Sequence, residues 1–197
     1  MSCKFIVASH NLHKLEELRE ILVPLGFSVV GPDDVGGISE PEENGTTFEE
    51  NALIKARSAC KETGLAAIAD DSGLCVDALD GAPGVHSARY ASDGHDFAAN
   101  NRLLLRNLEG VANRRARFRT VISLLVGDEE HLFEGVVEGR IVERESGAEG
   151  FGYDPLFVPD GCDRTFAEMS PDEKNAVSHR GRAVRKLAAF LRARGEK

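Results

Sequence analysis

A short apolar run, residues 65–69, leads directly into two adjacent aspartates, Asp70 and Asp71, and then into Ser72 and Gly73. The run predicts a buried strand, and the Ser-Gly pair predicts that this strand ends in a turn. Two carboxylates would then lie at the rim of a sheet. Burying them without compensation is unfavourable by several kcal/mol, so we expect a positively charged partner, most simply a divalent cation. A turn held by Asx hydrogen bonds is the alternative.

The order of the other patterns predicts an α/β fold (mixed α+β). In the first half, short apolar runs alternate with amphipathic stretches, and one helix is expected from Phe48 to Gly64, behind a capping box that begins at Thr47. Residues 116–126 and 132–142 predict an antiparallel hairpin, which makes the sheet a mixed one. No repeat and no boundary is visible, so residues 1–197 are expected to form a single domain.

The composition narrows the choice of partners. The formal net charge is −9, which argues against nucleic-acid binding because that function needs a basic surface. No apolar stretch approaches the roughly 20 residues that span a bilayer. We therefore expect a soluble, cytoplasmic protein with no membrane and no nucleic-acid partner. Reduced thiols are expected because no CxxC spacing occurs among the cysteines, which are Cys3, Cys60, Cys75 and Cys162.

A lysine on the predicted helix could complement the aspartates. Asn51 and Lys55 share one face of this helix, one turn apart. The strand that carries Asp70 and Asp71 follows the helix, so Lys55 is expected close to the carboxylates. A solvated lysine on a helix surface is the alternative.

The segment from Ser9 to Lys14 connects an apolar run to the start of another helix. Backbone amides at a helix N-terminus can bind an anion, and a lysine in the first turn is better explained if such an anion is present. Alternatively, Asn11 is an ordinary helix cap and Lys14 an ordinary surface lysine.

Residues 150–155 alternate glycine with aromatic side chains before an aspartate. This pattern suits a backbone that approaches a flat ligand while Phe151 or Tyr153 stacks on it, and Pro155 keeps the preceding Asp154 extended. Both rings could instead belong to the hydrophobic core.

Residues 174–182 bring together the cations that an acidic protein needs if it binds a phosphate. His179 and Arg180 could donate hydrogen bonds to a base carbonyl or to a phosphate. A basic helix face is the alternative. Considered together, the segments contain the parts of a nucleotide site, although no Walker-type GxxxxGK[ST] and no HExxH spacing occurs.

At these positions the sequence closely resembles the inosine triphosphate pyrophosphatase family, over nearly the whole chain and in the same order. The matching blocks are Ala8 to Lys14, Thr47 to Ala52, Lys55-Ala56, Ala69 to Leu74, Gly81 to Val85, Ser87 to Tyr90, Gly150 to Pro155, Glu173 to Asn175 and Ser178 to Gly181. Ser9 replaces the more usual threonine, and His10 stands where many members have glycine.

The resemblance implies a bilobed single domain with a long curved mixed sheet flanked by helices, a homodimer, and Mg²⁺-dependent hydrolysis of ITP, dITP and XTP to the monophosphate and pyrophosphate. It implies Asp71 as the catalytic base, Glu42 and Asp71 as metal ligands, and Lys55 in the catalytic set beside the phosphates. The substrate-binding residues that it implies are Ser9, His10, Asn11, Leu12, His13, Lys14, Ser72, Phe151, Gly152, Tyr153, Asp154, Lys174, His179 and Arg180.

Two other functions stay open at this point. A pyrophosphatase for modified pyrimidine triphosphates would use the same phosphate chemistry, but residues 178–181 argue against it. A non-catalytic nucleotide sensor would bind ITP without releasing pyrophosphate, and the set of Glu42, Lys55 and Asp71 argues against that function. A purely structural module would not need lysines around carboxylates.

Overall fold

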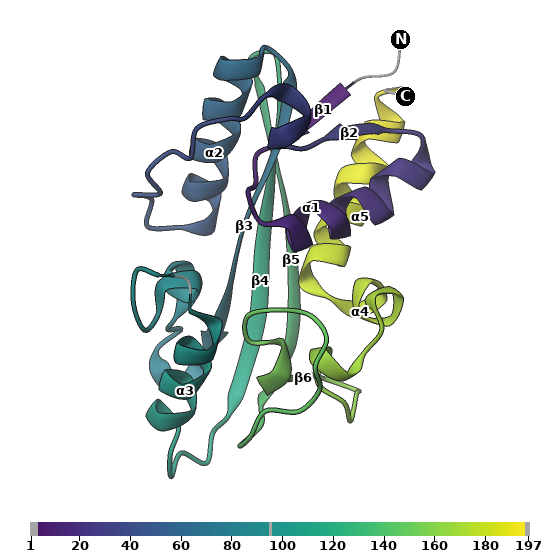
Figure 1. Cartoon of the computed structure of the whole chain (residues 1–197). Helices are drawn as coiled ribbons and strands as arrows, with labels where there is room; N and C mark the ends of the chain where they lie inside the picture. Colours follow the sequence, from purple (N-terminus) through teal and green to yellow (C-terminus); the bar gives the residue numbers. More distant parts are fainter. Residues whose placement is uncertain (1–3, 95, 196–197) are drawn as a thin grey trace. The chain divides into compact units, whose positions relative to one another are not determined.

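The computed structural model describes residues 4–94 and 96–195, so Cys3 lies outside the described residues. Helices and strands alternate in the first half, and a long hairpin follows (Figure 1). In chain order the elements are β1 (Lys4–Val7), α1 (Leu12–Leu22), β2 (Ser28–Val30), α2 (Phe48–Thr63), β3 (Ala66–Val76), α3 (Phe97–Asn107), β4 (Arg115–Val126), β5 (Glu129–Ile141), β6 (Phe157–Pro159), α4 (Pro171–Val177) and α5 (His179–Ala193).

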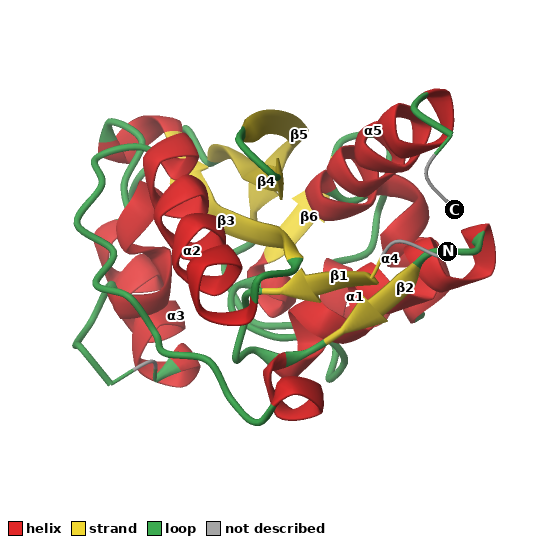
Figure 2. Cartoon of the chain, turned by 90° about the horizontal axis from the view of Figure 1, so that it is seen from above, coloured by secondary structure: helices red, strands yellow, loops and turns green. Residues whose placement is uncertain are grey.

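The strands form one mixed sheet, as expected. Their order is β2-β1-β3-β4-β5-β6. Strand β1 runs parallel to both β2 and β3, and Figure 2 shows β1 beside β2. Strands β5 and β6 are antiparallel. The α/β class and the hairpin of β4 and β5 are therefore confirmed.

Strand β3 corrects one expectation. It does not end at the aspartates but continues from Ala66 through Asp70, Asp71 and Gly73 to Val76. A Ser-Gly pair ends a strand only when the backbone leaves the sheet. Here β3 stays in the sheet, because it lies between β1 and β4 in the strand order. Strand β1 stops earlier, because Val7 pairs with Ile68 and the chain then turns toward α1. The carboxyl end of β1 thus reaches β3 just before the aspartates.

The chain divides into two compact units. The first contains Met1–Asp71, Thr120–Gly135 and Arg180–Lys197, and the second contains Ser72–Arg119 and Val136–His179. That residues 1–197 act as one domain stays a prediction.

In the first unit, the sheet is covered on both faces because its side chains alternate. Leu18 of α1 and Leu187 of α5 pack with Phe5 and Ile68 on one face. On the other face, Ala56 of α2 packs with alanines of β3, and the small side chains let this helix approach the sheet closely. Figure 1 shows α2 on one side of these strands and α1 with α5 on the other.

Helix α2 begins and ends where the sequence predicts. The Thr47 side chain accepts a hydrogen bond from the Glu50 amide, and the Glu50 carboxylate accepts one from the Thr47 amide. Gly64 ends the helix with φ +68°, a conformation that favours glycine. The rigid start of α2 sets the direction in which Asn51 and Lys55 point.

The second unit has its own core. Leu104 of α3, Phe118 of β4 and Phe157 of β6 belong to it. No helix among the described residues is long and apolar enough to cross a membrane. Three cysteines in the described ranges, Cys60, Cys75 and Cys162, are free, which agrees with the expectation of reduced thiols.

Candidate active site

Asp70 and Asp71 lie side by side on β3, but their side chains point to opposite faces of the sheet because successive strand residues alternate. Asp70 has the same orientation as Ile68, on the face of α1 and α5, whereas Asp71 has that of Ala69, on the face of α2. The two carboxylates therefore belong to two neighbouring groups of charged side chains in the first unit, which interact electrostatically with each other.

The first group surrounds Asp70, whose side chain is fully buried. The Lys14 ammonium lies 3.0 Å from Asp70 Oδ2, and Arg180 reaches the same oxygen with Nε at 3.3 Å and Nη2 at 3.4 Å. Arg180 also donates from Nη1 to the Glu17 carboxylate. Arg180 is itself only 2% exposed. Four charges, two of each sign, thus neutralise one another inside the unit.

The electrostatics of this group keep Asp70 ionised. Burial acts to raise the pKa of Asp70, but Lys14 and Arg180 outweigh it and hold the pKa far below its ordinary value. Burial also lowers the pKa of Lys14, and the neighbouring Asp70 only partly opposes that shift. Asp70 is thus suited to hold two cations in place rather than to exchange a proton.

The second group surrounds Asp71. The Lys55 ammonium lies 3.2 Å from Asp71 Oδ1 and 3.3 Å from Glu43 Oε1. Asn51 donates from Nδ2 to Asp71 Oδ2 at 3.3 Å, and its Oδ1 accepts from the Gly45 amide at 2.9 Å. The prediction that Lys55 lies beside the aspartates is confirmed, and the solvated alternative is wrong since Lys55 is 9% exposed.

The pKa of Asp71 moves in the opposite direction from that of its neighbour. Burial raises it above the ordinary value, and Lys55 and Lys14 compensate only in part. For Lys55, burial acts to lower the pKa, but Asp71 and Glu43 outweigh it and the pKa is raised. Two adjacent carboxylates with opposite shifts can take different roles.

In the segment from Ser9 to Lys14, the structure supports the interpretation of Asn11 as a helix cap. Asn11 Oδ1 accepts hydrogen bonds from the amides of His13 and Lys14 at 3.0 and 3.3 Å, and the Asn11 amide donates to Ser9 Oγ. Two amides of the expected anion cradle are therefore already paired. His10 contacts the Ile38 carbonyl, and Leu12 is 63% exposed. Further along this segment, Lys14 reaches the carboxylate of Asp70.

A third group lies in the second unit, around the buried carboxylate of Asp154. Asp154 Oδ2 accepts from Lys174 Nζ at 2.8 Å and from the Phe151 amide at 2.8 Å. The Lys174 ammonium also lies 4.9 Å from the centre of the Phe151 ring. Gly150 is required here, since a Cβ at this position would come within 2.2 Å of Asp154 Oδ2. A cation, a carboxylate and a half-buried ring are thus held together.

The second unit also contains three residues that were predicted to bind the substrate, namely Ser72, Tyr153 and His179. Tyr153 is 4% exposed and donates from its hydroxyl to the Ser87 carbonyl at 2.8 Å, and burial raises its pKa. The alternative of a core ring is therefore correct for Tyr153. His179 is buried and stacks on Phe118, with ring centres 4.7 Å apart. Ser72 is half-buried on β3.

That Glu42 is a metal ligand stays a prediction. Its side chain is exposed and makes no hydrogen bond or ion pair within the described part of the chain, whereas Glu43 contacts Lys55. Among the described residues, no group of three or more potential ligands could hold a metal by itself. Asp71 and the acidic loop nevertheless fit Mg²⁺, because this ion is commonly held by one or two carboxylates with the remaining positions taken by water and phosphate.

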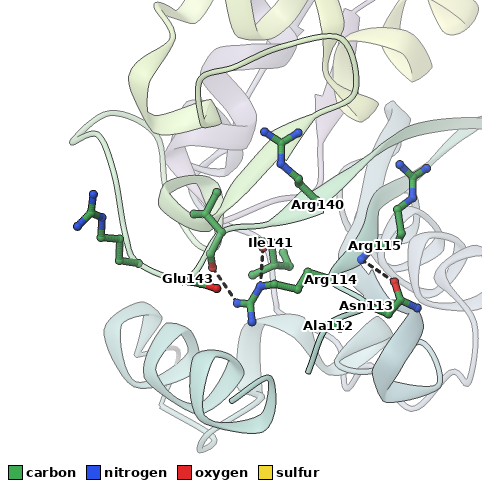
Figure 3. A pocket seen from close by; sticks show the side chains of 9 residues that line it. Ala112, Asn113, Arg114, Arg115, Arg140, Ile141 and Glu143 are labelled. Carbon is green, nitrogen blue, oxygen red and sulfur yellow. Dashed lines mark hydrogen bonds between the residues drawn. The ribbon is translucent and has the colours of Figure 1, made fainter. Parts of the chain in front are cut away.

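A cavity of about 800 Å³ lies elsewhere in the second unit and contains none of the predicted site residues (Figure 3). Arginines line it, but Arg114 uses its guanidinium on the carbonyls of Leu108, Ile141 and Val142. In Figure 3, Arg115 and Arg140 point away from Arg114. The guanidinium groups do not converge on one point, so the cavity is not a built anion site.

Two contacts were missed by the sequence reasoning. Glu17 could have been found, because it follows Lys14 by three residues and so shares a helix face with it. Glu43 could not, because it lies in an irregular acidic loop where no periodicity shows which carboxylate points inward.

The mixed sheet and the lysine–carboxylate groups on its two faces define an α/β protein with a charged site on its central strand. The chain belongs to the Ham1 family, whose family model matches residues 5–190. It is 49% identical to a dITP/XTP pyrophosphatase of Bacillus licheniformis, with 94% of this chain and 96% of the relative covered. A relative of the same description from Nocardia farcinica is 51% identical, with 96% and 95% covered.

Solved structures agree with this assignment. The Ham1 protein of Staphylococcus aureus has a TM-score of 0.87 and 41% identity, and the comparison covers 98% of this chain and all of that one. A HAM1 protein from Coxiella burnetii has a TM-score of 0.89 and 42% identity, with 97% and 99% covered.

Proposed function

We propose that this chain hydrolyses non-standard purine nucleoside triphosphates, namely dITP, ITP and XTP, to the monophosphate and pyrophosphate. Relatives described as dITP/XTP pyrophosphatases support the substrate class. The observation that carries the chemistry is the contact of Lys55 with Asp71, which combines a phosphate-binding cation with a carboxylate of raised pKa.

In the proposed reaction, a water oxygen attacks the α-phosphorus in line. The new bond joins this oxygen to phosphorus, and the bond between the α-phosphorus and the bridging oxygen breaks as pyrophosphate leaves. Asp71 orients the water and accepts its proton. Lys55, and Lys14 beside Asp70, stabilise the negative charge that develops on the phosphate oxygens.

A magnesium ion is part of this proposal. Asp71 and the acidic loop, with Glu42 from the resemblance and Glu43 from its contact with Lys55, would hold it. When bound, the ion would neutralise phosphate charge and lower the pKa of the attacking water. The oxygen-rich donor set suits this hard cation better than zinc.

In the second unit, Phe151 offers a ring for the base and Lys174 offers an N–H donor next to it. Hypoxanthine and xanthine have a carbonyl at position six, which accepts from such a donor, whereas adenine has an amino group there. A donor that faces an amino group gains no hydrogen bond from the base, which disfavours adenine. A pyrimidine base has a single ring, so it offers less surface than a purine for stacking on Phe151.

The test is pyrophosphate release from dITP, ITP, XTP, ATP and GTP, each with and without Mg²⁺. We expect kcat/KM to be far higher for dITP, ITP and XTP than for ATP. Similar values for ITP and ATP would contradict the proposed selectivity. Binding of ITP without any release of pyrophosphate would instead favour the sensor.

The carboxylate that carries the chemistry is tested by Asp71→Asn. We expect kcat to fall by about 10²-fold or more, while nucleotide binding stays measurable. Asp33→Asn is the control because Asp33 is an exposed acidic residue of the same unit. Near-normal turnover of Asp71→Asn would remove Asp71 from the mechanism.

A homodimer also belongs to the proposal, and light scattering in solution tests it.

A further inference from the structure

The first turn of helix α3 contacts the glycine–aromatic segment at residues 150–154. Phe97 begins this helix, and its ring centre lies 6.2 Å from that of Phe151, with an angle of 44° between the rings. Phe97 is nevertheless 39% exposed. Its ring therefore continues the apolar surface of Phe151 toward solvent.

One helical turn further on, Asn101 contacts the next residue of the same segment. Its Nδ2 donates to the Gly152 carbonyl at 3.2 Å. Asn101 lies four residues after Phe97, so both side chains are on one face of α3. Gly152 has φ +63°, a conformation that glycine adopts readily but does not fix by itself, because it can adopt others as well. Asn101 and Phe97 thus restrain two neighbouring residues.

The arrangement is poorly explained by packing alone. Asn101 is 4% exposed, and its Oδ1 has no hydrogen-bond partner in the described part of the chain. A buried acceptor without a partner destabilises a fold, so a helix that only had to pack would place an apolar residue here. What Asn101 provides, and leucine would not, is the donor for Gly152.

We propose that Phe97 and Asn101 of α3 are positioning residues for the purine base, since they hold Phe151 and Gly152 in the conformation that binds it. This inference rests on the proposed function. Phe97 restricts the orientation of the Phe151 ring, and Asn101 sets the orientation of the Gly152 peptide. A ring that is already oriented loses less conformational freedom when a base stacks on it, so that binding is tighter. Neither Phe97 nor Asn101 is proposed to contact the phosphates.

The first experiment measures Phe97→Ala with dITP as substrate. We expect kcat/KM to fall about fivefold, mainly through KM, which is the factor expected when one aromatic pair is lost. Phe97→Tyr keeps the ring and should restore the wild-type KM. Leu132→Ala is the matched control. Leu132 is an apolar residue on β5 in the other unit, and its exposed fraction of 44% is similar to that of Phe97.

Inorganic triphosphate as a competitive inhibitor distinguishes base positioning from general damage. It carries the phosphates without the base, so its inhibition constant should be the same for wild type and Phe97→Ala. A parallel rise in this constant, or an unchanged KM for dITP, would overturn the inference for Phe97.

The second experiment uses Asn101→Leu. This substitution removes the unpaired acceptor, which is favourable, and the hydrogen bond to the Gly152 carbonyl, which is unfavourable, so we expect a Tm close to that of the wild type. The KM for dITP should nevertheless rise about fivefold, as for the loss of one hydrogen bond. A lowered Tm with unchanged KM would show that Asn101 has only a structural role.

The dissociation constant of dITP, measured by calorimetry for the same proteins, separates the two proposals. If the wild type neither binds nor hydrolyses dITP, the proposed function fails and this inference fails with it. If the wild type binds dITP and both variants bind it equally well, only the inference about α3 fails.

Discussion

At the scale of single residues, the most informative feature is that Asp70 and Asp71 are neighbours in the chain but have different surroundings. Asp70 is buried against Lys14 and Arg180, which keep its pKa low. Asp71 contacts Lys55 and has a raised pKa. The difference follows from strand geometry, which sends the two carboxylates to opposite faces. One carboxylate is thus structural and the other is available for chemistry.

The structural role of Asp70 predicts a large loss of stability in Asp70→Asn. Removing this charge leaves Lys14 and Arg180 buried with less compensation, and breaking a buried ion pair in this way costs about 3 kcal/mol or more. Unfolding in urea measures the effect. Asp33→Asn, an exposed substitution, should change the free energy of unfolding by less than about 0.5 kcal/mol. Wild-type stability of Asp70→Asn would contradict this role.

Lys55 is expected to act on the reaction rather than on the fold alone. Its ammonium lies beside both Asp71 and Glu43, where a phosphate would also bind. Lys55→Met removes the charge and keeps the length of the side chain, and we expect kcat for dITP to fall by about 10²-fold. Lys61→Met, on an exposed position of the same helix, is the control. Equal activity of the two variants would exclude Lys55 from catalysis.

At the scale of elements, side chains near the helix termini decide where the helices begin. Helix α4 starts with a capping box in which Ser170 and Glu173 satisfy each other's amides. Glu173 also pairs with Arg164 at 2.9 Å. Lys174, whose ammonium contacts Asp154, directly follows the capping glutamate, so the cap also orients a candidate binding residue.

This cap predicts a pH dependence. Hydrogen bonds from Arg164 and the Ser170 amide lower the pKa of Glu173 from 4.5 to about 2. A lowered pKa in the folded state stabilises the protein above pH 4.5, and this stabilisation is lost as the pH falls toward 2. The Tm difference between wild type and Glu173→Gln should therefore be larger at pH 7 than at pH 3.

Asp172→Asn is the control for this experiment, because it removes a charge from the same helical turn without removing the cap. A Tm difference for Glu173→Gln that does not change with pH would show that the carboxylate charge has no part in the cap.

At the scale of the whole molecule, an acidic chain holds its candidate phosphate-binding lysines next to carboxylates. The net charge is −9, yet Lys14, Lys55 and Lys174 each lie within 3.3 Å of a carboxylate oxygen. Such pairs orient the lysines before a ligand arrives and compensate for the burial of their charge. A bound triphosphate would compete with these carboxylates for the ammonium groups of the lysines.

The magnesium proposal is tested on the whole protein. After treatment with EDTA, pyrophosphate release from dITP should fall to the level of Asp71→Asn, and excess Mg²⁺ should restore it, because phosphate charge would otherwise be uncompensated at the acidic residues. Measuring Tm under the same conditions shows whether the fold is intact. Undiminished release in EDTA would contradict the metal requirement.

The predictable part of the fold depends on neighbouring residues. The capping box of α2, its end at Gly64, the cap of α1 at Asn11 and the start of α4 at Ser170 are all contacts within a few residues of the chain. The contact of Lys55 with Asp71 could also be inferred, because a helix that leads into a strand brings its inner face over that strand.

By itself, therefore, the sequence determined the helix ends, the hairpin, the family and the lysine–aspartate pair, since short-range hydrogen bonds and side-chain periodicity are written in adjacent residues. Only the tertiary structure decided that β3 continues through Asp70 and Asp71, that Arg180 is buried against Asp70, that Tyr153 is a core ring, and that Glu43 rather than Glu42 contacts Lys55. These features depend on partners far away in the chain, on strand pairing and on burial, and no local pattern specifies them.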